Sequence, residues 1–581
     1  MARPNKTGVL KMHPSIGSVL LKRANAALRN GGPIFLLLWV FAAHSAEIPG
    51  HAVASAHPLA TQAGIEVLSS GGNAFDAAVA VSAALAVVEP SGSGLGGGGF
   101  WLLRRADGQP DVFVDGRETA PLAAREDMYV VNGVADAKRS RDGALAAAIP
   151  GLPAGLDHLA QRYGRLPLSV TLAPAIRYAR DGFRVDLKLH KLLWFRRSAL
   201  RESPAATAAV LRWGVPVLPG MTLRQPALAT VLERLAAKGA PGFYQGETAA
   251  LLLAGVRAGG GIWTQKDLDA YRVAERTPLT FAYGAYRVAS APPPSAGGVA
   301  LAQALQQLEA LPQQSPVSRH AVIESLRRAF RDRAEFLGDP DFVSIPLKRL
   351  ASREYARTLA RGISPEKATP SSQLPPSTLG HEGDNTTHFS VLDRDGNAVA
   401  GTLSINLPFG SGFMAPGTGI FLNNEMDDFS AQVSASNAYG LIGSRANAIA
   451  PGKRPLSSMS PTFVDGPDGT LILGTPGGSR IISMVLLGVL GYTEGLNAQQ
   501  IVDLPRYHHQ YLPDEVQFEP EALSTDEQAT LKKMGHTLKA LDAPYGNMHV
   551  VRWDQKNKRL EAASDARGVG AAQVKSETPG K

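Results

Sequence analysis

The sequence contains no cysteine in 581 residues. This absence excludes disulfide bonds, thiol nucleophiles and metal sites with thiolate ligands. It does not exclude an exported protein, because a chain of this length can bury a core large enough to need no covalent cross-links. Low-complexity segments and internal repeats are also missing. With 44% hydrophobic and 19% charged residues, the composition is that of a globular protein.

Acidic side chains are missing from residues 1–46, which contain six basic ones. An apolar run from Pro33 to Ala43 follows the basic part, and small residues continue to Ala46. A basic segment, a short apolar run and small residues are the pattern of an export signal. The run is shorter than the roughly 20 residues that a membrane-spanning helix needs. We therefore expect residues 1–46 to be an export signal, with an uncleaved N-terminal membrane anchor as the alternative.

Most of the positive charge belongs to the same segment. The formal net charge is +8, and subtracting the six positive charges of residues 1–46 leaves +2 for the rest of the chain. A strongly basic protein is often a nucleic-acid binder, but a nearly neutral mature chain gives no such indication. We expect no nucleic-acid partner.

A glycine-rich segment, residues 92–97, matches the G-x-G-x-x-G pattern of dinucleotide-binding proteins. That pattern has this meaning only where it follows a strand and opens a helix. Here it follows a helix, predicted from the N-cap residue Asn73 to Val88, and precedes a strand-like run from Phe100 to Arg104. The context predicts a tight turn with close backbone packing, and no nucleotide.

The pattern of the chain changes near residue 369. Residues 152–361 are mostly helical and amphipathic, whereas residues 369–385 are rich in Ser, Pro, Gly and charge and are expected to form an exposed, mobile linker. Beyond the linker, Thr387 to Leu392 and Ala398 to Ser404 alternate around an Asp-Gly turn, which predicts a hairpin. An exposed linker is a place where a chain can be cut without unravelling its core.

Two threonines, Thr386 and Thr387, lie between this linker and the first strand. A threonine at a free N-terminus carries an attacking hydroxyl and an activating amine on one residue, so it needs no neighbouring histidine. From the spacing alone, either threonine is a candidate nucleophile. Thr-Thr also opens many ordinary strands, so the pair gains weight only from the segments around it.

Six segments, in their order along the chain, together resemble one protein family, the gamma-glutamyltransferases, which are N-terminal-nucleophile hydrolases. The resemblance runs from about residue 52 to about residue 570. The segments are Gly92 to Phe100, Asp115-Gly116-Arg117-Glu118, Asn385-Thr386-Thr387-His388, Asn423-Asn424-Glu425-Met426-Asp427-Asp428, Pro455-Leu456-Ser457-Ser458-Met459 and Pro476-Gly477-Gly478-Ser479.

The resemblance implies an α+β fold, a four-layer αββα sandwich built from two subunits of one self-cleaved precursor. It implies a cleavage site between Asn385 and Thr386. The products would be a large subunit, residues 47–385, and a small subunit, residues 386–581, which stay together as a heterodimer. With the export signal, this implies a location in the bacterial periplasm.

The resemblance also assigns the catalytic residues. It places the nucleophile at Thr386, both for self-cleavage and for turnover. Thr402 and Ser404 lie on the partner strand of the hairpin, where either hydroxyl would be near Thr386; many family members have threonine at the position of Ser404. Gly477 and Gly478 would supply the backbone N–H groups of an oxyanion hole.

The glutamyl head of the implied substrate carries a carboxylate and an ammonium, and both must be matched if water is excluded. The planar fork of Arg117 suits the carboxylate, with Ser457 and Ser458 as additional donors. For the ammonium, the resemblance implies Asp428, Asn406 and Glu425, a position at which many bacterial relatives have glutamine.

Residues 431–453, which include Tyr439, resemble a lid loop found in some family members. A lid over the site would exclude water and favour transfer to an amine over hydrolysis. His508 and His509 lack the spacing of a zinc-binding helix, so we expect no metal.

The implied activity is that of a gamma-glutamyltransferase and glutathione hydrolase. It would cleave glutathione and other gamma-glutamyl compounds without a cofactor, and pass the acyl group to water, amino acids or dipeptides. Two alternatives remain open. One is a related acylase for a glutaryl or cephalosporin side chain, which has no α-ammonium. The other is a secreted binding protein without chemistry. Asp428 together with Arg117 favours the zwitterionic substrate.

Overall fold

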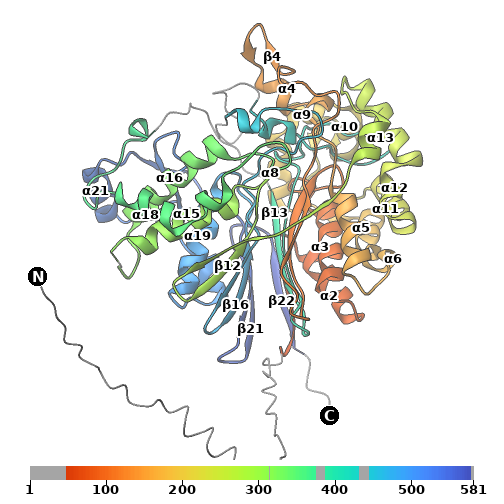
Figure 1. Cartoon of the computed structure of the whole chain (residues 1–581). Coiled ribbons are helices and arrows are strands. Elements are labelled where there is room, and N and C mark those ends of the chain that lie inside the picture. The colour runs from red at the N-terminus through yellow and green to blue at the C-terminus, as the bar shows by residue number, and fades with distance from the viewer. Residues whose placement is uncertain (1–47, 313, 375–385, 431–443, 577–581) are drawn as a thin grey trace, which may run out of the picture. The chain divides into compact units, whose positions relative to one another are not determined.

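A computed structural model describes residues 48–312, 314–374, 386–430 and 444–576 of the chain (Figure 1). The predicted export signal, the cleavage residue Asn385 and the lid residue Tyr439 lie outside the described residues. None of the described helices combines the length and the apolar character that crossing a membrane requires.

Two antiparallel sheets form the centre of the unit that spans residues 47–581. The first has seven strands, in the order β10 (Ala274–Arg276), β3 (Val112–Gly116), β2 (Gly98–Arg104), β14 (Ala398–Ser404), β13 (Thr387–Leu392), β1 (Gly50–Ser55) and β22 (Ala571–Ser576). The second has six, in the order β11 (Leu279–Tyr283), β12 (Tyr286–Ser290), β15 (Thr462–Gly466), β16 (Gly469–Gly474), β20 (His549–Asp554) and β21 (Arg559–Ser564).

The sheets pack face to face, since β13 and β14 contact β16, and β13 and β1 contact β20. The outer face of the first sheet is covered by α2 (Pro58–Ser69), α3 (Ala74–Val88) and α5 (Leu152–Arg162), and that of the second by α15 (Gly297–Ala310) and α19 (Arg480–Thr493), with α16 (Arg319–Phe336) packed on α15. Figure 1 shows both sheets between these two groups of helices. The predicted four-layer αββα sandwich is confirmed.

Smaller elements complete the fold. Further helices are α4 (Ala137–Arg141), α6 (Leu168–Thr171), α7 (Ala173–Asp181), α8 (Leu187–Phe195), α9 (Arg197–Arg201), α10 (Pro204–Val210), α11 (Pro226–Lys238), α12 (Pro241–Tyr244), α13 (Gly246–Ala258), α14 (Gln265–Ala270), α17 (Leu347–Leu350), α18 (Arg353–Arg361), α20 (Ala498–Val502) and α21 (Thr525–Met534). Further strands are β4 (Val130–Val131), β5 (Val134–Ala135), β6 (Phe183–Arg184), β7 (Leu211–Arg212), β8 (Val215–Pro216), β9 (Thr222–Leu223), β17 (Tyr507–His508), β18 (Val516–Phe518) and β19 (Leu538–Ala540).

Helix α3 begins and ends where the sequence predicts. The Asn73 side chain accepts hydrogen bonds from the N–H groups of Phe75 and Asp76, and the Asp76 carboxylate accepts from the Asn73 N–H, forming a capping box. Every residue of α3 is buried, because the helix lies between the first sheet and the outer helices α5 and α7.

The hairpin of β13 and β14 also has the predicted bounds. Its turn is closed by Asp393, whose carboxylate accepts from the Asn397 N–H at 2.9 Å, while Gly396 adopts a left-handed φ of 98°. The second oxygen of Asp393 accepts from the N–H of Ala74 at 2.9 Å, which fixes the turn to the start of α3. The hairpin is thus held at one end, and Thr386 lies at the other.

Residues 152–361 are mostly helical, as predicted, and they also contribute strands: β10 to β12 extend both sheets, because short alternating runs such as Tyr286–Ser290 pair with strands from distant parts of the chain. The start of the expected linker, residue 369, needs correction. Ser371 is buried and donates from its hydroxyl to the Tyr511 carbonyl at 2.7 Å. Residues 375–385 lie outside the described residues.

Candidate active site

One cavity collects predicted residues from both parts of the chain. These residues come from strand ends, turns and helix starts that are separated by up to about 360 positions in the sequence, and the fold brings them to one place. The cavity is lined by Arg117, Arg333, Thr386, Ser404, Asn406, Asp428, Leu456, Ser457, Ser458, Met459, Gly478 and Ile481. Thr402, Glu425 and Gly477 do not line it.

The structure distinguishes the two candidate nucleophiles. Successive residues of a strand point to opposite faces. Thr387 is turned away from the cavity: its hydroxyl donates to Glu89 Oε2 at 2.6 Å, and Lys188 Nζ lies 3.2 Å from Glu89 Oε1. Thr386 lines the cavity. Of the two, only Thr386 is placed to attack a bound molecule there.

The two hydroxyls of β14 have different neighbours. In the hairpin, Thr387 is opposite Leu403, so the register continues to Thr386 beside Ser404. Ser404 Oγ accepts from the Asn406 N–H at 2.8 Å and lines the cavity. Thr402 Oγ1 instead lies 2.8 Å from His388 Nδ1, and burial lowers the pKa of His388 well below its ordinary value, so that imidazole stays neutral. Ser404 is therefore the hydroxyl nearer to Thr386 along the strand.

The glycine-rich turn packs closely against the backbone of Ser404 and Phe421. A Cβ on Gly97 would overlap the carbonyl oxygen of Ser404, and one on Gly96 would overlap that of Phe421. The segment follows α3 and leads into β2, which confirms the predicted tight turn rather than a dinucleotide site.

A buried ion cluster surrounds Arg117. Its Nη1 donates to Glu425 Oε2 at 2.6 Å, its Nη2 to Asp428 Oδ2 at 2.6 Å, and its Nε to the carbonyl of Pro455 at 3.2 Å. Glu118 Oε2 lies 3.6 Å from Nη1, and burial raises the pKa of Glu118 to about 7, with Arg117 opposing that rise. Burial also raises the pKa of Glu425 well above its ordinary value, and the charge of Arg117 opposes that rise. Arg117 itself remains charged, because Glu425 and Asp428 raise its pKa.

The three residues predicted for an ammonium occupy different depths. Asp428 lines the cavity with a side chain that is 12% exposed, and Asn406 lines it with a left-handed φ of 70° and its Nδ2 bonded to the Asn424 carbonyl at 2.9 Å. Glu425 is completely buried behind them against Arg117. Asp428 and Asn406 therefore border the cavity, whereas Glu425 contacts Arg117 and does not line it.

The serine pair stands on a rigid turn. The Ser457 N–H donates to the Pro294 carbonyl, and the Ser457 carbonyl accepts from the Ala296 N–H, both at 2.8 Å. Among the described residues, nothing hydrogen-bonds to the buried Ser458 Oγ. Because a buried hydroxyl without a partner is costly, Ser458 has a donor to offer to a ligand oxygen.

Gly477 and Gly478 lie at the start of α19. Both have left-handed φ angles, 138° and 54°, and the Arg480 N–H donates to the Gly477 carbonyl at 3.0 Å. The free N–H groups at the start of a helix, with the positive end of its dipole, stabilise a negative oxygen nearby. This arrangement suits an oxyanion hole.

Replacing Gly477 with alanine tests that role. The new methyl group would lie 2.6 Å from Met484 Cε and would occupy a backbone conformation that alanine disfavours. Alanine keeps the backbone N–H, but strain at this φ of 138° should move that N–H away from the oxygen it is proposed to bind. We therefore expect kcat to fall by up to about 10²–10³, the usual cost of losing one oxyanion donor, with little change in KM. Steady-state kinetics on gamma-glutamyl-p-nitroanilide measures this; an unchanged kcat would remove Gly477 from the oxyanion hole.

Arg333 is a cavity residue that the sequence patterns do not identify. It projects from α16, its side chain is buried, and among the described residues its Nε has no hydrogen-bond partner. Burial lowers the pKa of Arg333 to about 10, and the charge of Asp428 opposes this. Arg333 thus places a second cation beside Asp428. The sequence does not distinguish Arg333 from the other arginines of α16, because only the packing of the helix shows which one faces the cavity.

One group of described residues brings metal-ligating atoms within 4.8 Å of one another, namely His320, Glu324 and His536. These atoms already have partners. His320 bonds to His536 and to the Ser364 carbonyl, and Glu324 pairs with two arginines, Arg327 and Arg328. Next to two guanidinium groups, a cation is electrostatically disfavoured. This group is therefore a poor metal site, and the absence of a metal remains a prediction.

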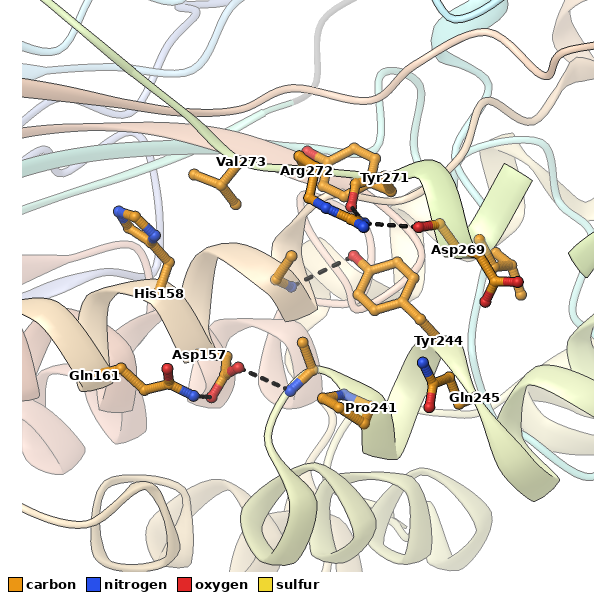
Figure 2. Close-up of a pocket in the computed structure, with 13 residues that line it drawn as sticks. Asp157, His158, Gln161, Pro241, Tyr244, Gln245, Asp269, Tyr271, Arg272 and Val273 are labelled. Carbon is orange, nitrogen blue, oxygen red and sulfur yellow. Dashed lines mark hydrogen bonds between the residues drawn. The ribbon is translucent and has the colours of Figure 1, made fainter. Parts of the chain in front are cut away.

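A wider hollow of about 620 Å³ lies elsewhere, beside α5 and α12 (Figure 2). Its polar groups are largely occupied: Asp157 accepts from Gln161 and from the Ala240 N–H, and the Tyr244 hydroxyl donates to the Pro150 carbonyl. It contains none of the predicted site residues. The cavity at Thr386 is the candidate site, because it brings a threonine hydroxyl together with charged side chains of both signs.

Comparisons with known proteins agree with this geometry. A glutathione hydrolase proenzyme from Pseudomonas sp. (strain A14) is 45% identical over 492 residues, 83% of this chain and 85% of the relative. Among solved structures, a cephalosporin acylase from Bacillus halodurans has a TM-score of 0.80 and 27% identity over 91% of this chain and 96% of its own. The Helicobacter pylori gamma-glutamyltranspeptidase has a TM-score of 0.54 and 37% identity over 55% of this chain and 94% of its own.

The names of the relatives differ, acylase or glutathione hydrolase, while the cephalosporin acylase structure shares the fold of this chain over 91% of its length. The family model described as gamma-glutamyltranspeptidase matches residues 60–575, which is nearly the whole described chain. The chain therefore belongs to the gamma-glutamyltranspeptidase family.

Proposed function

We propose that this protein is a gamma-glutamyltransferase and glutathione hydrolase that acts through a covalent intermediate on Thr386. The observation that carries the proposal is the single cavity in which Thr386 lies with Arg117 and Asp428. A nucleophile, a cation for a carboxylate and an anion for an ammonium are the three groups that a gamma-glutamyl amide needs. The 45% identity to a glutathione hydrolase proenzyme supports the same substrate class.

The reaction would begin with maturation of the precursor. The Thr386 hydroxyl attacks the carbonyl carbon of Asn385, the peptide bond becomes an ester, and water hydrolyses the ester to leave a free amine on Thr386. The two products, residues 47–385 and 386–581, remain paired, because β13 and β14 of the small subunit lie between β2 and β1 of the large one in a single sheet.

In turnover, the new amine of Thr386 accepts the proton of its own hydroxyl. The oxygen then attacks the gamma carbonyl of the substrate, and the N–H groups of Gly477 and Gly478 stabilise the negative oxygen that forms. Collapse of this intermediate expels the leaving amine, which takes the proton from the Thr386 ammonium. When the substrate is glutathione, the leaving amine is cysteinylglycine. Water or the amine of an amino acid or dipeptide then attacks the acyl-enzyme and frees Thr386.

The binding of the glutamyl head follows from the ion pair already present. Arg117 and Asp428 are bonded to each other at 2.6 Å in the cavity wall. The α-carboxylate of the substrate would lie beside Arg117, and its α-ammonium beside Asp428. The single ion pair between Arg117 and Asp428 is then replaced by two ion pairs with the substrate. Ser457 and Ser458 add hydroxyl donors to the carboxylate, and Asn406 adds its amide near the ammonium. Because a zwitterion is neutral overall, this exchange leaves the net charge of the site unchanged.

We further propose that residues 1–46 direct export, so that the enzyme works in the periplasm, and that Thr402, Glu425 and the lid residue Tyr439 assist the site indirectly. Thr402 would act through His388, and Glu425 through Arg117. Tyr439 would cover the bound acyl group and exclude water.

The competing activity is that of an acylase for glutaryl groups. The structural similarity to a cephalosporin acylase is the observation that favours this alternative. The test compares gamma-glutamyl-p-nitroanilide with glutaryl-p-nitroanilide, which differ only in the α-ammonium. Without that ammonium, Asp428 and Arg117 gain no matched pair of ligand charges. We expect kcat/KM for the gamma-glutamyl compound to be higher by about 30- to 4,000-fold, the equivalent of 2–5 kcal/mol. Equal or faster turnover of the glutaryl compound would establish the acylase instead.

A further inference from the structure

More than half of the exposed large hydrophobic side chains of the described residues lie in one short segment. Of thirteen such side chains among the described residues, seven lie between residues 187 and 221. Phe195 is 71% exposed at the end of α8, and Trp213 is fully exposed at the turn between β7 and β8. We define the α8–β8 surface by these seven residues: Leu187, Trp194, Phe195, Trp213, Val215, Leu218 and Met221.

Hydrogen bonds join the parts of this surface into one unit. His190 of α8 bonds through Nδ1 to the Val217 carbonyl at 2.8 Å. Arg201 of α9 donates to the carbonyl of Gly214, in the β7–β8 turn, at 2.8 Å. The Val185 N–H, just before α8, donates to the Met221 carbonyl at 2.9 Å. Figure 1 shows α8, α9 and α10 close together toward the top of the molecule. The segments that carry the seven side chains are therefore joined to one another by hydrogen bonds.

The surface is also strongly basic. Residues 184–224 contain eight lysines and arginines and two acidic residues, a net charge of +6. Because residues 47–581 sum to +2, the rest of that chain carries −4. Of the two acids, Asp186 accepts from the Leu189 N–H within α8, and Glu202 pairs with Lys138 of α4 at 2.9 Å. Two of the cations, Lys188 and Arg196, pair with Glu89 and Asp142 outside the segment. Five of the cations are exposed, namely Arg184, Lys191, Arg201, Arg212 and Arg224.

Aromatic and aliphatic tips surrounded by lysine and arginine are characteristic of proteins that lie on a membrane surface. The rings enter the boundary between headgroups and acyl chains, and nearby cations are attracted to the negative charge of an anionic leaflet. A second copy of this chain fits less well, because it would place +6 against +6. We propose that the α8–β8 surface binds the protein to anionic phospholipid bilayers. This inference is independent of the proposed catalytic function.

The test is co-sedimentation of the full chain with vesicles of phosphatidylcholine containing phosphatidylglycerol, and with vesicles of phosphatidylcholine alone. The variant Phe195→Ser with Trp213→Ser removes the two outermost tips, and Lys191→Glu with Arg212→Glu reverses two charges. The matched control, Val170→Ser with Phe342→Ser, removes two exposed hydrophobic side chains outside the surface. The N-terminal segment is present in every protein, so differences between them report on the α8–β8 surface.

We expect the partition coefficient for phosphatidylglycerol vesicles to fall at least tenfold in both surface variants and to stay within twofold of wild type in the control. Raising the salt concentration should weaken wild-type binding. Turnover and Tm should be unchanged in all variants, because none of these residues lines the cavity at Thr386. Equal binding by wild type and both surface variants would overturn the proposal. So would loss of self-association or of nucleic-acid binding in those variants with no change on vesicles.

Discussion

Replacing Thr386 with alanine is expected to leave the chain in one piece and without turnover. The hydroxyl that would attack the preceding carbonyl is gone, so no ester forms and no amine is freed. Even if the chain were cut by another protease, alanine has no oxygen to accept the acyl group. We expect a single species in the denatured intact mass and a loss of kcat of at least about 10⁴-fold, as for other nucleophile replacements.

Thr387→Val is the matched control for this prediction. It also removes a threonine hydroxyl beside the cleavage site, but one that faces Glu89 rather than the cavity. We expect this variant to be cleaved and to turn over substrate, with some loss of stability from the broken hydrogen bond. If Thr387→Val remained uncleaved while Thr386→Ala matured normally, the assignment of the two threonines would have to be exchanged.

The second large effect is expected from Asp428→Asn. An amide keeps the shape of the side chain but removes the charge that would face the substrate ammonium, and it leaves Arg117 Nη2 with a neutral partner. Removing one member of a buried charge pair usually costs 2–5 kcal/mol. We therefore expect kcat/KM for gamma-glutamyl-p-nitroanilide to fall by about 30- to 4,000-fold, chiefly through KM, while self-cleavage before Thr386 proceeds.

Asp427→Asn provides the comparison for Asp428. This neighbour belongs to the same short helical turn, η3 (Glu425–Asp428), but its carboxylate accepts from the Ser140 hydroxyl at 2.5 Å, away from the cavity. The substitution should lower Tm and leave kcat/KM within a few-fold of wild type. Unchanged kinetics in Asp428→Asn, or an equal loss in both variants, would show that the charge of Asp428 is not what selects the substrate.

The parts of the fold that the sequence predicts well are those set by local chemistry. Asn73 and Asp76 cap α3 through contacts three residues apart, and the Asp-Gly turn after Leu392 fixes the register of β13 and β14. Two-residue alternation along β13 also implies that Thr386 and Thr387 face opposite ways. It does not say which face borders the cavity, because that depends on the second sheet and on α3.

The features that escaped prediction depend on packing between distant segments. Arg333 is one of several arginines on α16, and only the position of that helix over the site distinguishes it from its neighbours. Glu425 contacts Arg117, and Thr402 Oγ1 lies beside His388 Nδ1; neither residue lines the cavity. In each case the residue type and its place in the sequence are compatible with a position at the cavity and with one behind it. Which of the two is occupied depends on the elements that pack over the side chain.

The most direct test of Thr386 as an N-terminal nucleophile is the intact mass of the purified protein, recorded before and immediately after mixing with a gamma-glutamyl substrate and quenching in acid. The prediction is two fragments, the smaller beginning at Thr386, and a mass gain on that fragment equal to one gamma-glutamyl group. An active protein that remains a single chain, or one in which the gain falls on the larger fragment, would contradict it.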